Sequence, residues 1–188
     1  MKRIPRNEGA KKACEALPTS LWVLLKYFSF KEITVRMLCA EAHVGRHTFR
    51  LYFKDKYDLL GHCLAEVWNG VAAGTNEDET LERRISELLC ANEKIIANVL
   101  RDANTRTLAC IHEFMHSIIG RLLKAGDGTS PNHMILYHFC AGGLVKHLEQ
   151  IASNRFPSGM DEINAYLFRM LKAIAAWDAQ QEAGEAGC

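Results

Sequence analysis

The stretch FKEITVRMLCAEAHVGRHTFRLYFKDKYDLL, residues 30–60, carries the signals for two short helices joined by a tight turn. Thr34 can cap the first helix, because a threonine oxygen accepts hydrogen bonds from the free N–H groups at a helix start. The inward face of this helix would hold Val35, Leu38 and Ala42, and the turn falls at AHVG, residues 42–45.

The second short helix is expected over residues 46–53, with Phe49 and Phe53 packed inward. Asp55 then opens a further helix, and Asp58 three residues on completes an arrangement similar to a capping box. Two short helices around such a turn form a helix-turn-helix, whose second helix can enter the DNA major groove.

The outer face of the second helix has the chemistry for that role. Arginine can bond bidentately to guanine, threonine or histidine can touch base edges, and tyrosine or lysine can hold phosphates. These side chains are Arg46, His47, Thr48, Arg50 and Tyr52, followed by Lys56. The alternative is a basic, solvated surface on a helix that only packs.

Charge is distributed unevenly along the chain. Residues 1–60 contain twelve Lys and Arg against six Asp and Glu, whereas residues 61–188 contain eleven against sixteen. The net charge of +1 therefore hides a basic first third. A basic segment next to an acidic remainder favours a polyanion as partner of the first third alone.

Residues 30–60 closely resemble the DNA-binding domain of the TetR family of bacterial transcription regulators. The resemblance is strong over about residues 17–70 and concerns only the architecture beyond. The matching residues are Phe30, Ile33, Thr34, Val35, Ala42, Val44, Arg46, Thr48, Phe49, Tyr52, Phe53, Lys54, Asp55, Lys56, Leu59 and Leu60.

The resemblance implies an all-α homodimer that represses transcription by binding a palindromic operator and is released by a small-molecule effector. Residues 1–60 would be the helix-turn-helix DNA-binding domain, and residues 61–188 the effector-binding and dimerisation domain. We expect double-stranded DNA to be contacted by Thr34, Arg36, Arg46, His47, Thr48, Arg50, Tyr52 and Lys56.

Three residues depart from the family pattern. His43 replaces the usual turn glycine, which would place a non-glycine residue at positive φ. Gly45 replaces a Ser or Thr cap, which weakens the start of the second helix by a few tenths of a kcal/mol. Arg50 replaces a common tyrosine that contacts the DNA backbone, and an arginine can still hold a phosphate.

Helical spacing of apolar residues dominates the rest of the chain, so the fold class is predicted to be all-α. The first long helix is expected over residues 17–28, with Pro18 in its first turn. A start at Lys11 would instead place Pro18 where it kinks the helix. Further helices are predicted at residues 55–73, 79–100, 105–124, 131–152 and 161–178.

Cysteine usage and hydropathy predict a cytoplasmic protein with no membrane contact. The seven cysteines form no C-x-x-C pair and leave one over, which argues against a disulfide framework. No apolar run approaches the roughly 20 residues that span a bilayer. No cofactor is expected.

The stretch IHEFMH, residues 111–116, fits the zinc-binding pattern H-E-x-x-H. A zinc hydrolase built on His112, Glu113 and His116 is one alternative, and a metal-responsive regulator with His138 as third ligand is another. No further histidine continues a known protease pattern, since residue 122 is Leu. We therefore expect no enzyme and no bound metal, with these histidines in the effector domain.

The effector and dimer sites are predicted from apolar faces on the later helices. An apolar pocket for a small, mostly apolar organic effector that is not highly charged is expected, lined by Trp68, Ile85, Leu89, His112, Met115 and Tyr137. Small residues let another backbone approach closely, and a regular apolar stripe suits a partner helix. The dimer interface is accordingly expected at Ala141, Gly142, Gly143, Ile163, Leu167, Met170, Ile174 and Trp177.

Overall fold

The computed structural model describes residues 8–73 and 78–122, and beyond these residues 138–139, 141–143, 145–146, 148–150, 165, 168–170, 172–173 and 176. The described residues form helices and no strand, which confirms the all-α prediction. Over residues 8–73 and 78–122 the helices are α1 Glu8–Leu25, α2 Val35–Glu41, α3 Arg46–Tyr52, α4 Lys56–Ala72, α5 Asp78–Ala91, α6 Glu93–Leu100 and α7 Thr105–Leu122.

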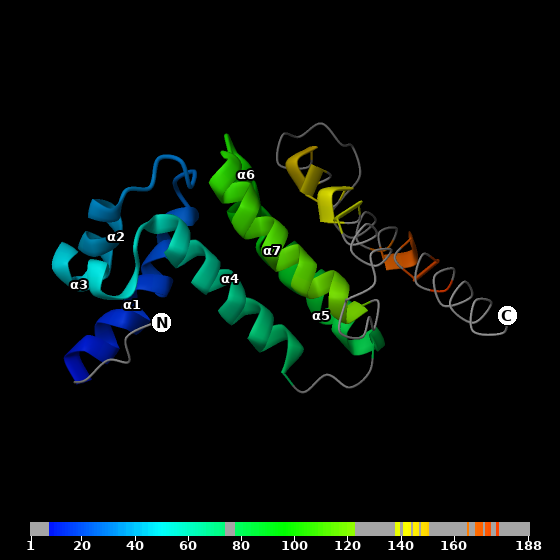
Figure 1. Cartoon of the computed structure of the whole chain (residues 1–188), viewed down its shortest axis with the longest axis horizontal. Helices are drawn as coiled ribbons and strands as arrows, with labels where there is room; N and C mark the ends of the chain where they lie inside the picture. Colours follow the sequence, from blue (N-terminus) through cyan, green and yellow to red (C-terminus); the bar gives the residue numbers. More distant parts are fainter. Residues whose placement is uncertain are drawn as a thin grey trace, which may run out of the picture.

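The first three helices pack together into a small unit at one end of the molecule, which we call the reading head (Figure 1). Its core is made by fully buried apolar side chains, namely Leu17, Leu21, Leu25, Phe30, Ile33, Leu38, Phe49 and Phe53. The inward placement of Phe49 and Phe53 is confirmed, and their rings lie 5.8 Å apart. Burial of these side chains holds α2 and α3 in a fixed arrangement.

Both predicted helix caps are present. The Thr34 hydroxyl accepts a hydrogen bond from the N–H of Met37 at 3.3 Å. The Asp55 carboxylate accepts from the N–H groups of Tyr57 and Asp58 at 2.9 and 3.1 Å. Asp58 accepts in turn from the N–H of Lys54, so the start of α4 is secured from both sides.

The first helix differs from its prediction at both ends. It begins at Glu8, so Pro18 lies inside the helix rather than in its first turn. It ends at Leu25, where the chain tightens through hydrogen bonds from the N–H groups of Lys26 and Tyr27 to residues three positions earlier. Phe28, the last residue of the predicted helix, lies beyond its end and is 41% exposed.

Helix α4 runs from the reading head along α7, and these two helices have the most extensive contact between any described pair (Figure 1). The boundary expected at residue 60 falls within α4, which packs on α1 at one end and on α5 and α7 along its length. A movement of α7 against α4 would therefore be transmitted to the reading head.

The helix predicted over residues 79–100 is two helices, because Asn92 interrupts it. The Asn92 side chain donates to the carbonyl of Leu88 at 2.8 Å, and its backbone leaves the helical region. Asparagine competes with the backbone for hydrogen bonds in this way, which ends α5 and starts α6.

The C-terminal part is described only in short pieces, among which Ala141, Val145 and Leu148 are buried in the apolar core. None of the helices described has the combination of length and apolar character that crossing a bilayer would require.

Candidate nucleic-acid interface and effector cavity

The polar face of α3 is open to solvent. Arg46, His47 and Arg50 are exposed, while Thr48 and Tyr52 are half-buried. Thr34 and Arg36, near the start of α2, are exposed as well. The structure thus leaves a basic helix surface free on the side opposite Phe49, as the sequence pattern indicated.

The turn between α2 and α3 has the conformation that the departures from the family pattern implied. His43 has φ of 54°, in the left-handed region that side chains with a Cβ rarely adopt. Gly45 occupies the N-cap position of α3 in an extended conformation and supplies no side-chain cap. The turn is closed by backbone bonds, among them one from the N–H of Val44 to the carbonyl of Cys39 at 2.9 Å.

Lys56, predicted as a phosphate contact, has its ammonium on backbone carbonyls in this structure. Its ammonium donates to the carbonyls of Phe30, Lys31 and Ile33 at 2.7, 3.1 and 2.8 Å. Burial lowers the pKa of Lys56. Because an ammonium has three donors, these bonds satisfy it, and Lys56 fastens the loop between α1 and α2 to the start of α4.

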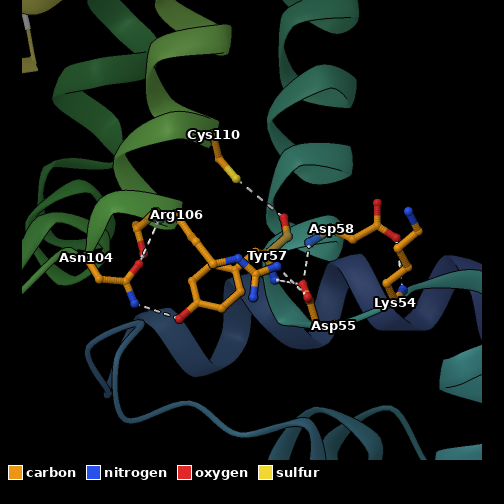
Figure 2. A network of polar contacts seen from close by, with 8 residues as sticks. Lys54, Asp55, Tyr57, Asp58, Asn104, Arg106 and Cys110 are labelled. Carbon is orange, nitrogen blue, oxygen red and sulfur yellow. Dashed lines mark hydrogen bonds and ion pairs between the residues drawn. The ribbon is translucent and has the colours of Figure 1, made fainter.

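A polar network joins the start of α4 to the start of α7 (Figure 2). Arg106 hydrogen-bonds to the Asp55 carboxylate and lies 4.1 Å from the centre of the Tyr57 ring. Asn104 donates to the Tyr57 hydroxyl at 2.7 Å and caps α7 by accepting from the N–H of Thr107 at 3.0 Å. The caps of α4 and α7 are therefore linked through Tyr57 and Arg106.

The electrostatics of this network favour ionised Asp55. Burial raises its pKa, but hydrogen bonds from Arg106 and from the N–H groups of Asp58 and Tyr57 outweigh that effect and leave the pKa lowered. The hydrogen bond to Asp55 also raises the pKa of Arg106. The sequence predicted the cap but not the partner, because 51 residues separate Asp55 from Arg106.

An apolar cavity of about 380 Å³ lies between α4, α5, α6 and α7 and reaches the end of α1. Its size is typical of a site for a small organic molecule. Among the described residues that line it, only Lys26 and Asn92 are polar. These lining residues are Trp22, Lys26, Leu64, Val67, Leu88, Leu89, Asn92, Ile95, Ile96, Val99, Leu100, Ile111, Phe114, Met115 and Leu148.

The cavity coincides only in part with the predicted pocket. Leu89 and Met115 line it, whereas Trp68 and His112 do not. Ile85 is buried in the core and is not among the residues that line the cavity. Tyr137 lies outside the described residues.

The sequence reasoning missed the contributions of α1 and α6 to this cavity. The apolar run Ile95, Ile96 and Val99 was visible as one face of a helix, but nothing local indicated that it encloses a cavity. Trp22 and Lys26 belong to the reading head, and only the tertiary structure brings them to α6.

The H-E-x-x-H stretch lies on α7, where His112 and His116 are half-buried and Glu113 is exposed. The rings of His116 and His138 meet edge to face, with centres 4.9 Å apart. Burial lowers the pKa of His116, and the neighbouring His138 and His112 lower it further. Within the ranges that the structure describes, no group of three His, Cys, Asp or Glu could hold a metal ion.

The predicted dimer face is described for four of its residues. Gly142 and Gly143 have open space where a Cβ would lie, and Met170 is 42% exposed. Ala141 is fully buried within the single chain, so it belongs to the core rather than to an interface surface. Ile163, Leu167, Ile174 and Trp177 lie outside the described residues, and Phe139, 73% exposed, was not predicted.

Comparison with known proteins supports the fold. No family model matches the sequence, and no curated protein is significantly similar to it. A TetR transcriptional regulator from Streptococcus agalactiae is 18% identical, with TM-score 0.60, over 87% of this chain and 95% of that one. A putative TetR-family regulator from Syntrophomonas wolfei is 19% identical, with TM-score 0.59, over 88% and 96%.

The transcriptional regulator FadR from Bacillus subtilis, solved with stearoyl-CoA, is 14% identical, with TM-score 0.50, over 84% and 96%. In this chain a helix-turn-helix is followed by a helical domain. This is the fold of solved TetR-family transcriptional regulators.

Proposed function

We propose that this protein is a ligand-responsive transcriptional regulator, which as a homodimer represses genes by binding a palindromic operator. The observation that carries the proposal is the basic, exposed face of α3 on a helix whose other face is anchored by Phe49. A helix held in this way and projecting arginines is suited to the major groove, where base edges are read.

The DNA contacts divide by position on the helices. Arg46 and His47 lie at the start of α3, the part of a recognition helix that commonly meets base edges. Arg36, Arg50 and Tyr52 flank it and would hold phosphates on either side. Lys56 is omitted from this set, because its ammonium is already bonded to three carbonyls.

A dimer would present two reading heads to one duplex. Half-sites on one face of DNA lie about 34–36 Å apart, so the two copies of α3 must meet that spacing. The exposed Phe139 and Met170, with the open surface at Gly142 and Gly143, support a dimer interface on the C-terminal helices.

The cavity supports release by a small organic effector. FadR, with the same fold, was solved with stearoyl-CoA, which carries a long apolar chain. The cavity in this chain is lined almost wholly by apolar side chains and touches both α4 and α7. A ligand that favours a different packing of these helices would change the separation of the heads, because α4 enters the reading head directly.

The test is selection of operator DNA by the full-length protein from duplexes with a randomised centre. We expect enrichment of an inverted repeat whose half-sites are centred about 10–10.5 base pairs apart, or a multiple of that spacing. Affinity should fall steeply with salt, because Lys and Arg displace counterions from phosphates. Absence of any enriched sequence would contradict the proposal.

A metal-responsive regulator is a second candidate, supported by the contact between His116 and His138 on the described part of the chain. Neutral imidazoles are common ligands of Zn²⁺, Cu²⁺ and Ni²⁺. Metal analysis of the purified protein, followed by titration with each ion, tests this candidate. Stoichiometric metal whose removal changes operator affinity would favour it over an organic effector.

A further inference from the structure

Lys26 is the only charged side chain that lines the apolar cavity among the described residues. It follows the end of α1 directly and lies four positions after Trp22, which lines the same cavity. Both residues line the cavity at the end of α1, so they approach it from the same side of the reading head.

The backbone around Lys26 is held in place by buried Asn98 on α6. The Asn98 side chain donates to the carbonyl of Leu25 at 2.8 Å, and its own carbonyl accepts from the N–H of Phe30, also at 2.8 Å. Asn98 is 4% exposed, so water does not compete for these bonds. The backbone on either side of Lys26, at the edge of the cavity, is therefore held by α6.

The surroundings of Lys26 would select the charge of a ligand. No acidic residue lines the cavity in the part of the chain that the structure describes. Lys26 is exposed, so its end of the cavity reaches solvent, whereas the isoleucines and leucines behind it offer only apolar contact. An apolar chain with one anionic end would bury its body and keep its charge at Lys26, while a cationic end would be repelled.

We propose that the effector is an amphiphilic anion, an apolar chain ending in a single carboxylate or phosphate, and that Lys26 pairs with this anionic end. The ligand would then contact the reading head itself, rather than acting on it only through α4. This inference rests on the proposed role of the cavity as the effector site.

The test is calorimetric titration of the full-length protein, without DNA, with decanoate, decyl phosphate and the uncharged 1-decanol. We expect at least one anion to bind about tenfold more tightly than decanol, a modest charge-assisted contribution for a partly solvated pair. Preference for decanoate or for decyl phosphate identifies the anionic group.

Three variants separate charge from packing. Lys26→Gln should remove the advantage of the anion and leave decanol binding unchanged, and Lys26→Glu should reverse the preference toward decylamine. Lys31→Gln is the matched control, because Lys31 lies on the same loop but pairs with Asp102 on the surface at 3.7 Å. It should bind all probes as the unaltered protein does.

The inference is overturned if decanol binds as tightly as both anions, if no probe binds, or if Lys26→Gln weakens all probes equally. Operator selection is a separate measurement. Anion binding through Lys26 without release of a selected operator would count against the proposed regulation and leave the inference standing. Operator binding without anion preference would count against the inference and leave the proposed regulation standing.

Discussion

Lys56 offers a sharp test, because its position in the sequence and its place in the structure predict different effects. As a phosphate contact, its loss would weaken binding to all DNA sequences alike and lower the slope of affinity against salt by about one. The structure instead uses its ammonium to hold the loop between α1 and α2 against the start of α4. We therefore expect Lys56→Met to destabilise the reading head.

The size of the effect follows from the three hydrogen bonds. A bond to a charged group contributes about 1.5–3 kcal/mol, and removal of the ammonium leaves three carbonyls without this partner. The bonds to Phe30 and Ile33 are partly buried, at 2.7 and 2.8 Å, whereas the carbonyl of Lys31 is exposed and can return to water. Desolvation of the ammonium offsets part of the gain, so we expect a loss of about 2–4 kcal/mol.

The assay has two readings. Thermal unfolding followed by circular dichroism should show the midpoint lowered by roughly 5–15 °C for a chain of this length. Titration of operator DNA at several salt concentrations, below the unfolding transition, should give an unchanged salt slope. Methionine keeps the aliphatic stem beside the Phe30 ring, whose centre lies 4.8 Å from the ammonium, so loss of packing is minimised.

The matched control is Lys54→Met. Lys54 is exposed, and its hydrogen bond to Asp58 comes from its backbone N–H rather than from its ammonium. Its replacement should change stability by no more than about 0.5 kcal/mol. The reasoning is refuted if Lys56→Met lowers the free energy of unfolding by less than about 1 kcal/mol while the salt slope of DNA binding falls. Lys56 would then contact a DNA phosphate.

Further predictions concern DNA reading, acid stability, dimerisation and the cavity. Arg46→Ala should cost about 1–3 kcal/mol of discrimination between the selected operator and a mismatched duplex, and an unchanged ratio in a competition assay would exclude Arg46 as a base contact. Asp55 has a lowered pKa in the folded chain, so its stabilising effect is complete above its ordinary pKa of about 4 and is lost as the pH falls through the lower folded value. Urea unfolding should accordingly show the stability difference between the unaltered protein and Asp55→Asn shrinking below about pH 4, and a constant difference would contradict this. If the protein forms the proposed dimer, Met170→Glu should convert it to a monomer in sedimentation, and two identical dimer profiles would place the interface elsewhere. Ile96→Trp should fill the cavity and abolish binding of decanoate while operator affinity without ligand changes little, whereas His112→Trp, outside the lining, should leave decanoate binding intact.

The reading head could be predicted closely because its signals are local. Thr34 and Asp55 predict the starts of α2 and α4, because their side-chain oxygens can accept hydrogen bonds from the first N–H groups of a helix, and both caps are observed. The spacing of Phe49 and Phe53 defined the buried face of α3 and thereby its exposed basic face. The positive φ of His43 also followed from the turn that the motif requires.

Predictions for the helices after α4, and for the pocket between them, were less accurate. The helix expected over residues 79–100 divides at Asn92, because a single side chain bonded to the carbonyl of Leu88 competes with the helix backbone. Of the expected pocket residues, Leu89 and Met115 line the cavity and Trp68 does not, because apolar periodicity marks a buried face without telling core from cavity.

What the sequence determined by itself is therefore the all-α class, the two short helices with the caps at Thr34 and Asp55, and the exposed basic face of α3. These depend on interactions within a few residues, which are the same in any tertiary context. Only the tertiary structure decided that Lys56 binds carbonyls rather than phosphate, that Arg106 meets Asp55, and that Lys26 reaches the cavity. Each of these depends on distant segments that meet when the apolar faces are buried. The hydrogen bonds that hold these segments together join residues 23 to 73 positions apart in the sequence. Burial is non-directional, so the sequence specifies that a face is covered but not which distant residue covers it.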